Sequence, residues 1–104
     1  MVRFKTGVSL TGVCPQVVLG IMISADVYAK HNIDMWVTSV ADGSHGKYSR
    51  HYQGMAWDMR VWNIPSDAIR HQIFDELKQA LGESFMLLDE KDHFHASFKP
   101  NFVG

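Results

Sequence analysis

The sequence predicts a small α+β domain with an antiparallel sheet and two main helices. Two segments space their apolar residues as helices do, and four shorter segments have the alternation or the β-branched and aromatic content of strands. The last two of these strands are separated only by a short turn, which favours antiparallel pairing. At 104 residues and 46% hydrophobic content, the chain fits one domain spanning residues 1–104.

The first helix is expected in PQVVLGIMISADVYAKHN, residues 15–32. Pro15 stands near the first turn, where proline is permitted, and Asn32 is a candidate stop. The residues that recur at three- and four-residue steps are Val18, Met22, Ala25 and Ala29.

Two strands are expected next, at 34–40 and 55–62. DMWVTSV is rich in β-branched and aromatic residues and runs into the turn-rich ADGSHGKYS, so a loop of about ten residues should follow it. MAWDMRVW alternates, with Asp58 and Arg60 on its accessible face. The residues of its core face are Met55, Trp57, Met59 and Val61.

The second helix is expected after Pro65, with Ser66 as its N-cap and Gly82 at the left-handed position beyond its end. Its apolar stripe consists of Ile69, Ile73, Leu77 and Leu81. A hairpin should follow, formed by SFMLLDE and HFHASF with KD in the turn. In the last strand, Phe94, Ala96 and Phe98 should face one side, and His93, His95 and Ser97 the other.

Charge and cysteine content exclude several classes of function. Ten basic residues against eleven acidic ones give a net charge of −1, which indicates no binding of nucleic acid or of an anionic membrane. Cys14 is the single cysteine, so a metal site would need histidine and carboxylate ligands. The apolar run VVLGIMI is too short to span a bilayer, and we expect neither a signal peptide nor membrane insertion.

Four polar groups are expected to meet at the accessible sheet face. Asp58 lies on one strand, His93 and His95 lie on another, and His51 enters from the loop. Zinc takes imidazole and carboxylate ligands, and three protein ligands leave a fourth position open. The set His51, Asp58 and His95 would meet this requirement, although an isolated His-x-His pair is more often a plain polar face.

Other residues near this set also have expected roles. Gly54 and Ala56 would be small because the chain passes close to a metal or substrate there. Asp92 could accept a proton from water. A regular strand would point Asp92 away from His95, so we expect its carboxylate in the turn or at a twisted strand start. Asp58 could instead be an ordinary partner of Arg60.

The run Ser49-x-His51-x-x-Gly54-x-Ala56-x-Asp58, followed by Asp92-His93-x-His95, resembles the signature of a family of zinc peptidases. The family includes D-Ala-D-Ala carboxypeptidases and phage L-alanyl-D-glutamate endolysins, and it shares its small α+β fold with the Hedgehog signalling domain. The order of elements along most of the chain is also similar. The resemblance implies Zn²⁺ held by His51, Asp58 and His95, with Asp92 as catalytic base and His93 near the substrate.

The sequence departs from this family within the expected site. Many relatives carry an arginine, thought to steady the developing oxyanion, shortly after the strand that corresponds to WVTSV, but here the loop reads ADGSHGKYSR. His45, Lys47 or Arg50 could replace it, and we prefer His45 as the auxiliary catalytic group. Arg60, Lys47 and Arg50 could hold substrate carboxylates. His31 and His71 are expected to be solvated surface residues.

Three functions are compatible with these residues. The first is a zinc metallopeptidase that hydrolyses an amide bond in the peptide stem of bacterial peptidoglycan, as a phage endolysin does. Such an enzyme would be made in the cytoplasm and would reach the wall after membrane opening, with a separate holin as partner. The second is a cytoplasmic D-Ala-D-Ala dipeptidase, and the third is a non-catalytic, zinc-stabilised binding module.

Overall fold

The structure, a computed structural model, describes residues 1–41 and 54–99. These residues form a small compact α+β domain with two helices and one five-stranded sheet. The predicted residues His45, Lys47, Arg50 and His51 lie outside the described residues. In chain order the elements are β1 (Val2–Phe4), α1 (Pro15–Ala29), β2 (Met35–Ser39), β3 (Ala56–Arg60), α2 (Asp67–Leu81), β4 (Phe85–Asp89) and β5 (His93–Phe98).

The sheet is mixed, with the strand order β1-β2-β3-β5-β4. The four predicted strands pair antiparallel, as expected, but β1 was not predicted and pairs parallel with β2. The prediction of a wholly antiparallel sheet is therefore wrong at this edge. The reason is the connection, because α1 carries the chain back across the sheet between β1 and β2, and such a crossover joins parallel strands.

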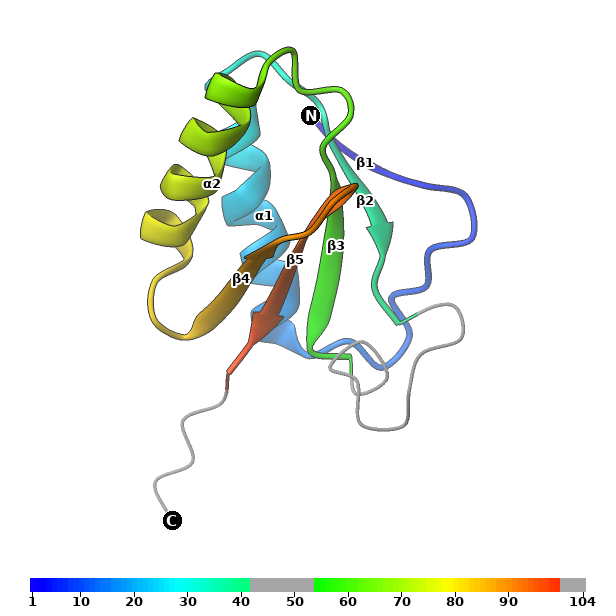
Figure 1. Ribbon diagram of the computed structural model, residues 1–104. Coiled ribbons are helices and arrows are strands. Elements are labelled where there is room, and N and C mark those ends of the chain that lie inside the picture. Colours follow the sequence, from blue (N-terminus) through cyan, green and yellow to red (C-terminus); the bar gives the residue numbers. More distant parts are fainter. Residues whose placement is uncertain (42–53, 100–104) are drawn as a thin grey trace.

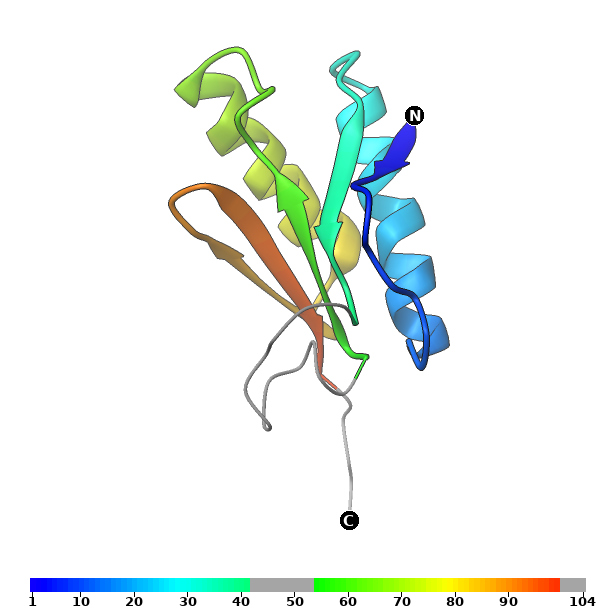
Figure 2. The same ribbon diagram turned by 90° about the vertical axis from the view of Figure 1, so that its right-hand side faces the viewer.

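Both helices cover one face of the sheet, and none of the described residues forms a helix on the other face (Figure 1). Figure 2 looks onto this second face, with α1 and α2 behind the strands. The helix side holds the core, and its strand residues are completely buried: Met35 and Val37 on β2, Trp57 and Met59 on β3, and Phe94 and Ala96 on β5. Because side chains alternate along a strand, the residues between them are directed to the face without helices.

Helix α1 packs very closely against β3. A Cβ atom on Gly20 would lie 2.5 Å from Cη2 of Trp57, so only glycine allows this approach. The helix begins at Pro15, and Asn32 has a φ of 57° just beyond the helix end, as the sequence predicted. The residues that recur at three- and four-residue steps do not form the core face, because Met22 is 62% exposed. The buried residues of α1 are Val17, Gly20, Ile21, Ser24, Val27 and Tyr28.

Helix α2 agrees closely with the sequence pattern. Oγ of Ser66 accepts a hydrogen bond from the Ile69 amide at 3.2 Å, and Gly82 has a φ of 75° at the other end. The buried residues are Ile73, Leu77 and Leu81. Among the described residues, no helix is both long and apolar enough to cross a membrane.

Candidate active site

Asp58 and His95 face each other across the neighbouring inner strands β3 and β5. They are direct partners in the antiparallel register, and both are on the face without helices. Nδ1 of His95 and Oδ1 of Asp58 lie 3.0 Å apart and share a hydrogen bond. Because both side chains are largely buried, at 15% and 16% exposure, the carboxylate and the imidazole interact with reduced screening by water. Two of the three predicted zinc ligands are therefore in contact.

His93 lies beside this pair, two residues before His95 on the same face of β5. Its Nε2 atom lies 3.7 Å from Oδ1 of Asp58, and its Nδ1 atom lies 2.6 Å from Oδ1 of Asp92. Nε2 also lies 3.9 Å from Oε1 of Glu90. His93 thus connects the turn between β4 and β5 to the centre of the site.

Asp92 lies in the turn immediately before β5, as the strand parity required. Its side chain is 86% exposed. The hydrogen bond from His93 and the charge of that imidazole hold the pKa of Asp92 below its ordinary value. The carboxylate is therefore ionised at neutral pH.

Asp58 and His95 supply a carboxylate oxygen and an imidazole nitrogen, which are atom types that bind zinc. With bonds of about 2.0–2.1 Å, two ligand atoms of a tetrahedral zinc lie about 3.3 Å apart. Between the two proposed ligands, Oδ1 of Asp58 and Nδ1 of His95, the distance is 3.0 Å, which is shorter than this value and corresponds to the direct hydrogen bond. Within residues 1–41 and 54–99, however, no group of three metal-binding side chains is assembled. The described part thus supplies two expected ligands, and a third would have to come from His51.

Gly54, in the turn before β3, is constrained by a neighbour that the sequence did not reveal. A Cβ atom on Gly54 would lie 2.3 Å from the carbonyl oxygen of Gly12, and its φ of 71° is unfavourable for other residues. The Cys14 amide donates a hydrogen bond to the Gly54 carbonyl at 3.0 Å. Contact with the loop before α1, instead of with a metal or substrate, is therefore the observed reason for a small residue. Ala56, two residues later, is buried opposite Ser97.

A cleft of about 250 Å³ adjoins the site on the His93 side. Its lining residues are Lys5, Thr38, Arg60, Trp62, Asp92 and His93. The guanidinium of Arg60 lies over the rings of Trp36 and Trp62, at 4.6 and 4.5 Å from their centroids. The alternative in which Asp58 pairs with Arg60 is not observed among the described residues, where the contacts of the Asp58 carboxylate are to His95 and His93. The sequence analysis missed Lys5 and Thr38, because β1 carries no strand pattern and Thr38 lies on a strand whose facing was not assigned.

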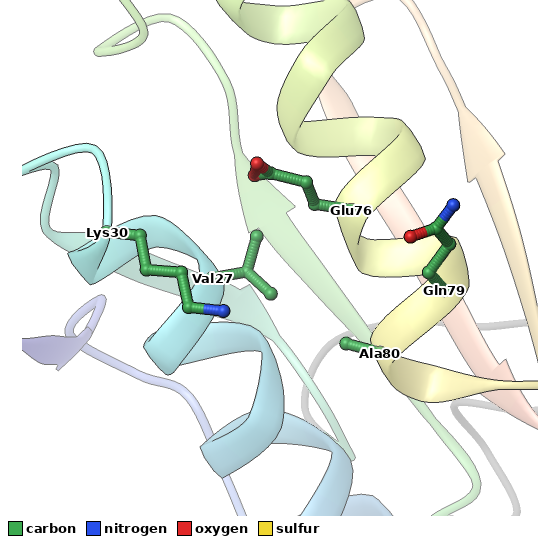
Figure 3. A pocket seen from close by; sticks show the side chains of 5 residues that line it. All are labelled: Val27, Lys30, Glu76, Gln79 and Ala80. Carbon is green, nitrogen blue, oxygen red and sulfur yellow. The ribbon is translucent and has the colours of Figure 1, made fainter.

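A second cavity, of about 290 Å³, lies between the two helices, and Figure 3 shows its lining residues. They are Val27, Lys30, Glu76, Gln79 and Ala80, and none belongs to the predicted site. At the same helix pair, Nε2 of His31 lies 2.7 Å from Oε2 of Glu76. The prediction that His31 is a solvated surface residue is thus wrong, whereas His71 is exposed as expected.

Comparisons with known proteins assign this chain to no family. No family model matches the sequence, and neither a curated protein nor a solved structure matches the chain.

Proposed function

We propose that this chain is a zinc metallopeptidase that hydrolyses an amide bond in the peptide stem of bacterial peptidoglycan. The observation that carries the proposal is the direct pairing of Asp58 and His95 on the open face of the sheet, with Asp92 connected to them through His93. The sequence adds His51 as the third ligand, and the order of these residues resembles that of the zinc peptidases. An ordinary surface aspartate would not need a largely buried histidine as its direct partner.

The proposed chemistry divides the residues by role. Asp58, His95 and His51 would hold Zn²⁺, which supplies Lewis-acid polarisation of the scissile carbonyl and makes water acidic enough to react near neutral pH. Asp92 takes the proton from the attacking water and passes it to the leaving amine. His93 keeps the Asp92 carboxylate oriented through the hydrogen bond of 2.6 Å. His45 is the proposed auxiliary group that steadies the negative charge on the carbonyl oxygen.

The exposure of the site's outer side supports a substrate attached to a polymer. Asp92 is 86% exposed and Trp62 is 72% exposed, so a peptide that extends from a glycan strand can reach them. We propose an endolysin-like enzyme, encoded by a phage, that is made in the cytoplasm and acts on the wall after a separate holin opens the membrane. A dipeptidase specific for free D-Ala-D-Ala would not need this access.

Purified protein should be incubated with zinc and stem-peptide muropeptides, and the new termini identified by mass spectrometry. We expect one zinc ion per chain and one new amine terminus per cleavage. His95→Ala should lose both the metal and turnover. Asp92→Asn should keep the metal but lower kcat by about 10²–10⁴-fold, the usual contribution of a general base.

His71→Ala is the matched control, because it removes a histidine that is exposed on α2 and distant from the proposed chemistry. It should keep both zinc and activity. A His95→Ala protein that retains its full zinc content contradicts the ligand assignment. Zinc binding without any cleavage would favour the binding module, and release of alanine from free D-Ala-D-Ala alone would favour the dipeptidase.

A further inference from the structure

Among residues 1–41 and 54–99, Arg60 is a cation held in place without an acidic partner. Its guanidinium lies over Trp36 and Trp62, and such ring contacts attract the charge without using conventional hydrogen-bond acceptors. In the part of the chain that the structure describes, its side chain makes neither an ion pair nor a hydrogen bond. An arginine side chain has five N–H donors, arranged to suit the two oxygens of a carboxylate. The protein thus fixes the orientation of a group whose donors remain available.

Lys5 adds a second positive charge to the same cleft. It follows β1 directly, and its backbone amide donates to the Val37 carbonyl at 2.9 Å, which fixes the backbone position of the lysine beside the sheet. No acidic side chain among residues 1–41 and 54–99 pairs with it. The carboxylate in the cleft, Asp92, is hydrogen-bonded to His93. Arg60 and Lys5 therefore share the cleft with one carboxylate, which already has a partner.

The position of this cleft relative to Asp58 defines what it can recognise. Arg60 lies two residues beyond Asp58 on β3, which corresponds to about 7 Å along the strand. An extended peptide covers about 3.3–3.6 Å per residue, so this separation equals about two residues of substrate. His93 lines the cleft and also reaches Asp58, so a peptide could occupy the cleft and the site together.

We propose that Arg60 and Lys5 form a subsite that binds a free carboxylate of an acidic peptide, about two residues from the amide bond at Asp58 and His95. The location of the amide bond rests on the proposed function, but carboxylate binding itself does not. The subsite selects substrates with an acidic group at this distance, and amidation of that group weakens their binding.

Binding can be measured without turnover by titrating the protein with N-acetyl-D-glutamate and, separately, with its diamide. The acid should shift the Arg60 side-chain Nε–H resonance in ¹⁵N NMR spectra, and the diamide should not. Arg60→Gln should raise the Kd for the acid about tenfold, because hydrogen bonds to charged groups are among the stronger ones. Lys5→Gln, at an exposed position that tolerates change, should raise it about threefold.

Arg3→Gln is the matched control. Arg3 is also an arginine near Trp36, at 5.8 Å from the ring centroid, but its Nε already donates to Asp34 at 2.8 Å. This variant should bind the acid as the wild type does. Equal affinity for acid and diamide, or wild-type affinity in both Arg60→Gln and Lys5→Gln, overturns the subsite. Selective acid binding without peptidase activity supports the subsite and refutes the proposed function instead.

Discussion

Gly54→Ala should destabilise the protein strongly, although it adds only one methyl group. Gly54 has a φ of 71°, and its new Cβ would lie 2.3 Å from the Gly12 carbonyl oxygen and 3.0 Å from Cα of Val13. Both contacts involve backbone atoms, which cannot rotate away as a side chain would. The turn before β3 would have to move, and β3 carries Asp58.

The size of the effect follows from two separate costs. A left-handed backbone conformation costs a residue other than glycine about 1 kcal/mol. Overpacking against neighbours that cannot move costs about 1–3 kcal/mol more, so the free energy of unfolding should fall by about 3 kcal/mol. At about 2.1 cal/mol/K per residue, a chain of 104 residues has an unfolding entropy of about 0.2 kcal/mol/K. The expected fall in Tm is therefore about 14 °C.

Thermal unfolding followed by circular dichroism measures this change, and Gly12→Ala is the matched control. Gly12 has a similar φ of 75°, but a Cβ atom there would meet nothing within 4 Å. Only the conformational cost of about 1 kcal/mol should remain, which is a fall in Tm of about 5 °C. If both variants lost the same stability, contact with Gly12 would not be the reason for glycine at position 54.

Two further predictions concern α2. Ser66→Ala should lower the free energy of unfolding by about 1 kcal/mol, because the Ile69 amide loses its cap, whereas Ser84→Ala should change little; equal losses in chemical denaturation would contradict the cap. The hydrogen bond with His31 lowers the pKa of Glu76, so this pair's stabilisation is complete above the ordinary carboxyl pKa and is lost as pH falls through the lowered one. In ¹³C NMR titrations, His31→Ala should raise the pKa of Glu76, and an unchanged titration curve would refute the coupling.

Helix α2 and the hairpin of β4 and β5 were predicted correctly, and each of them has two independent signals. Helix α2 has both a capping serine and a stripe of apolar residues every four positions. The hairpin of β4 and β5 has alternation on the last strand and a short polar turn. In each case the side-chain pattern and the residues at the ends of the element predict the same secondary structure.

The predictions that failed had weaker signals. Most positions of α1 from Val17 to Ile23 are apolar, so three- and four-residue spacing fits more than one face, and packing against Trp57 decides between them. Strand β1 has three exposed residues and no alternating burial, and its strand conformation comes from backbone pairing with β2. A contact made through backbone atoms leaves little trace in side-chain identity.

Parts of the candidate site were predictable for a similar reason. Alternation places Asp58, His93 and His95 on one face, and this could be inferred from the sequence. Alternation does not show which residue of β5 stands opposite Asp58, because a shift of two residues would preserve every facing. The same limit explains why Trp36, on the neighbouring strand, was not recognised as a contact of Arg60.

The proposed ligands and the proposed base differ in how strongly the fold restrains them. Asp58 and His95 lie on the inner strands β3 and β5, where hydrogen bonds on both sides restrict their backbones. Asp92 lies in an exposed turn and is restrained through its side-chain contact with His93. A metal requires fixed ligand positions, whereas a group that carries a proton between water and a leaving amine must reach two atoms in turn. Strands β3 and β5 thus provide the fixed positions of the proposed ligands, and the turn between β4 and β5 provides the mobility that the proposed base needs. His93 links the two parts, because it contacts both Asp58 and Asp92.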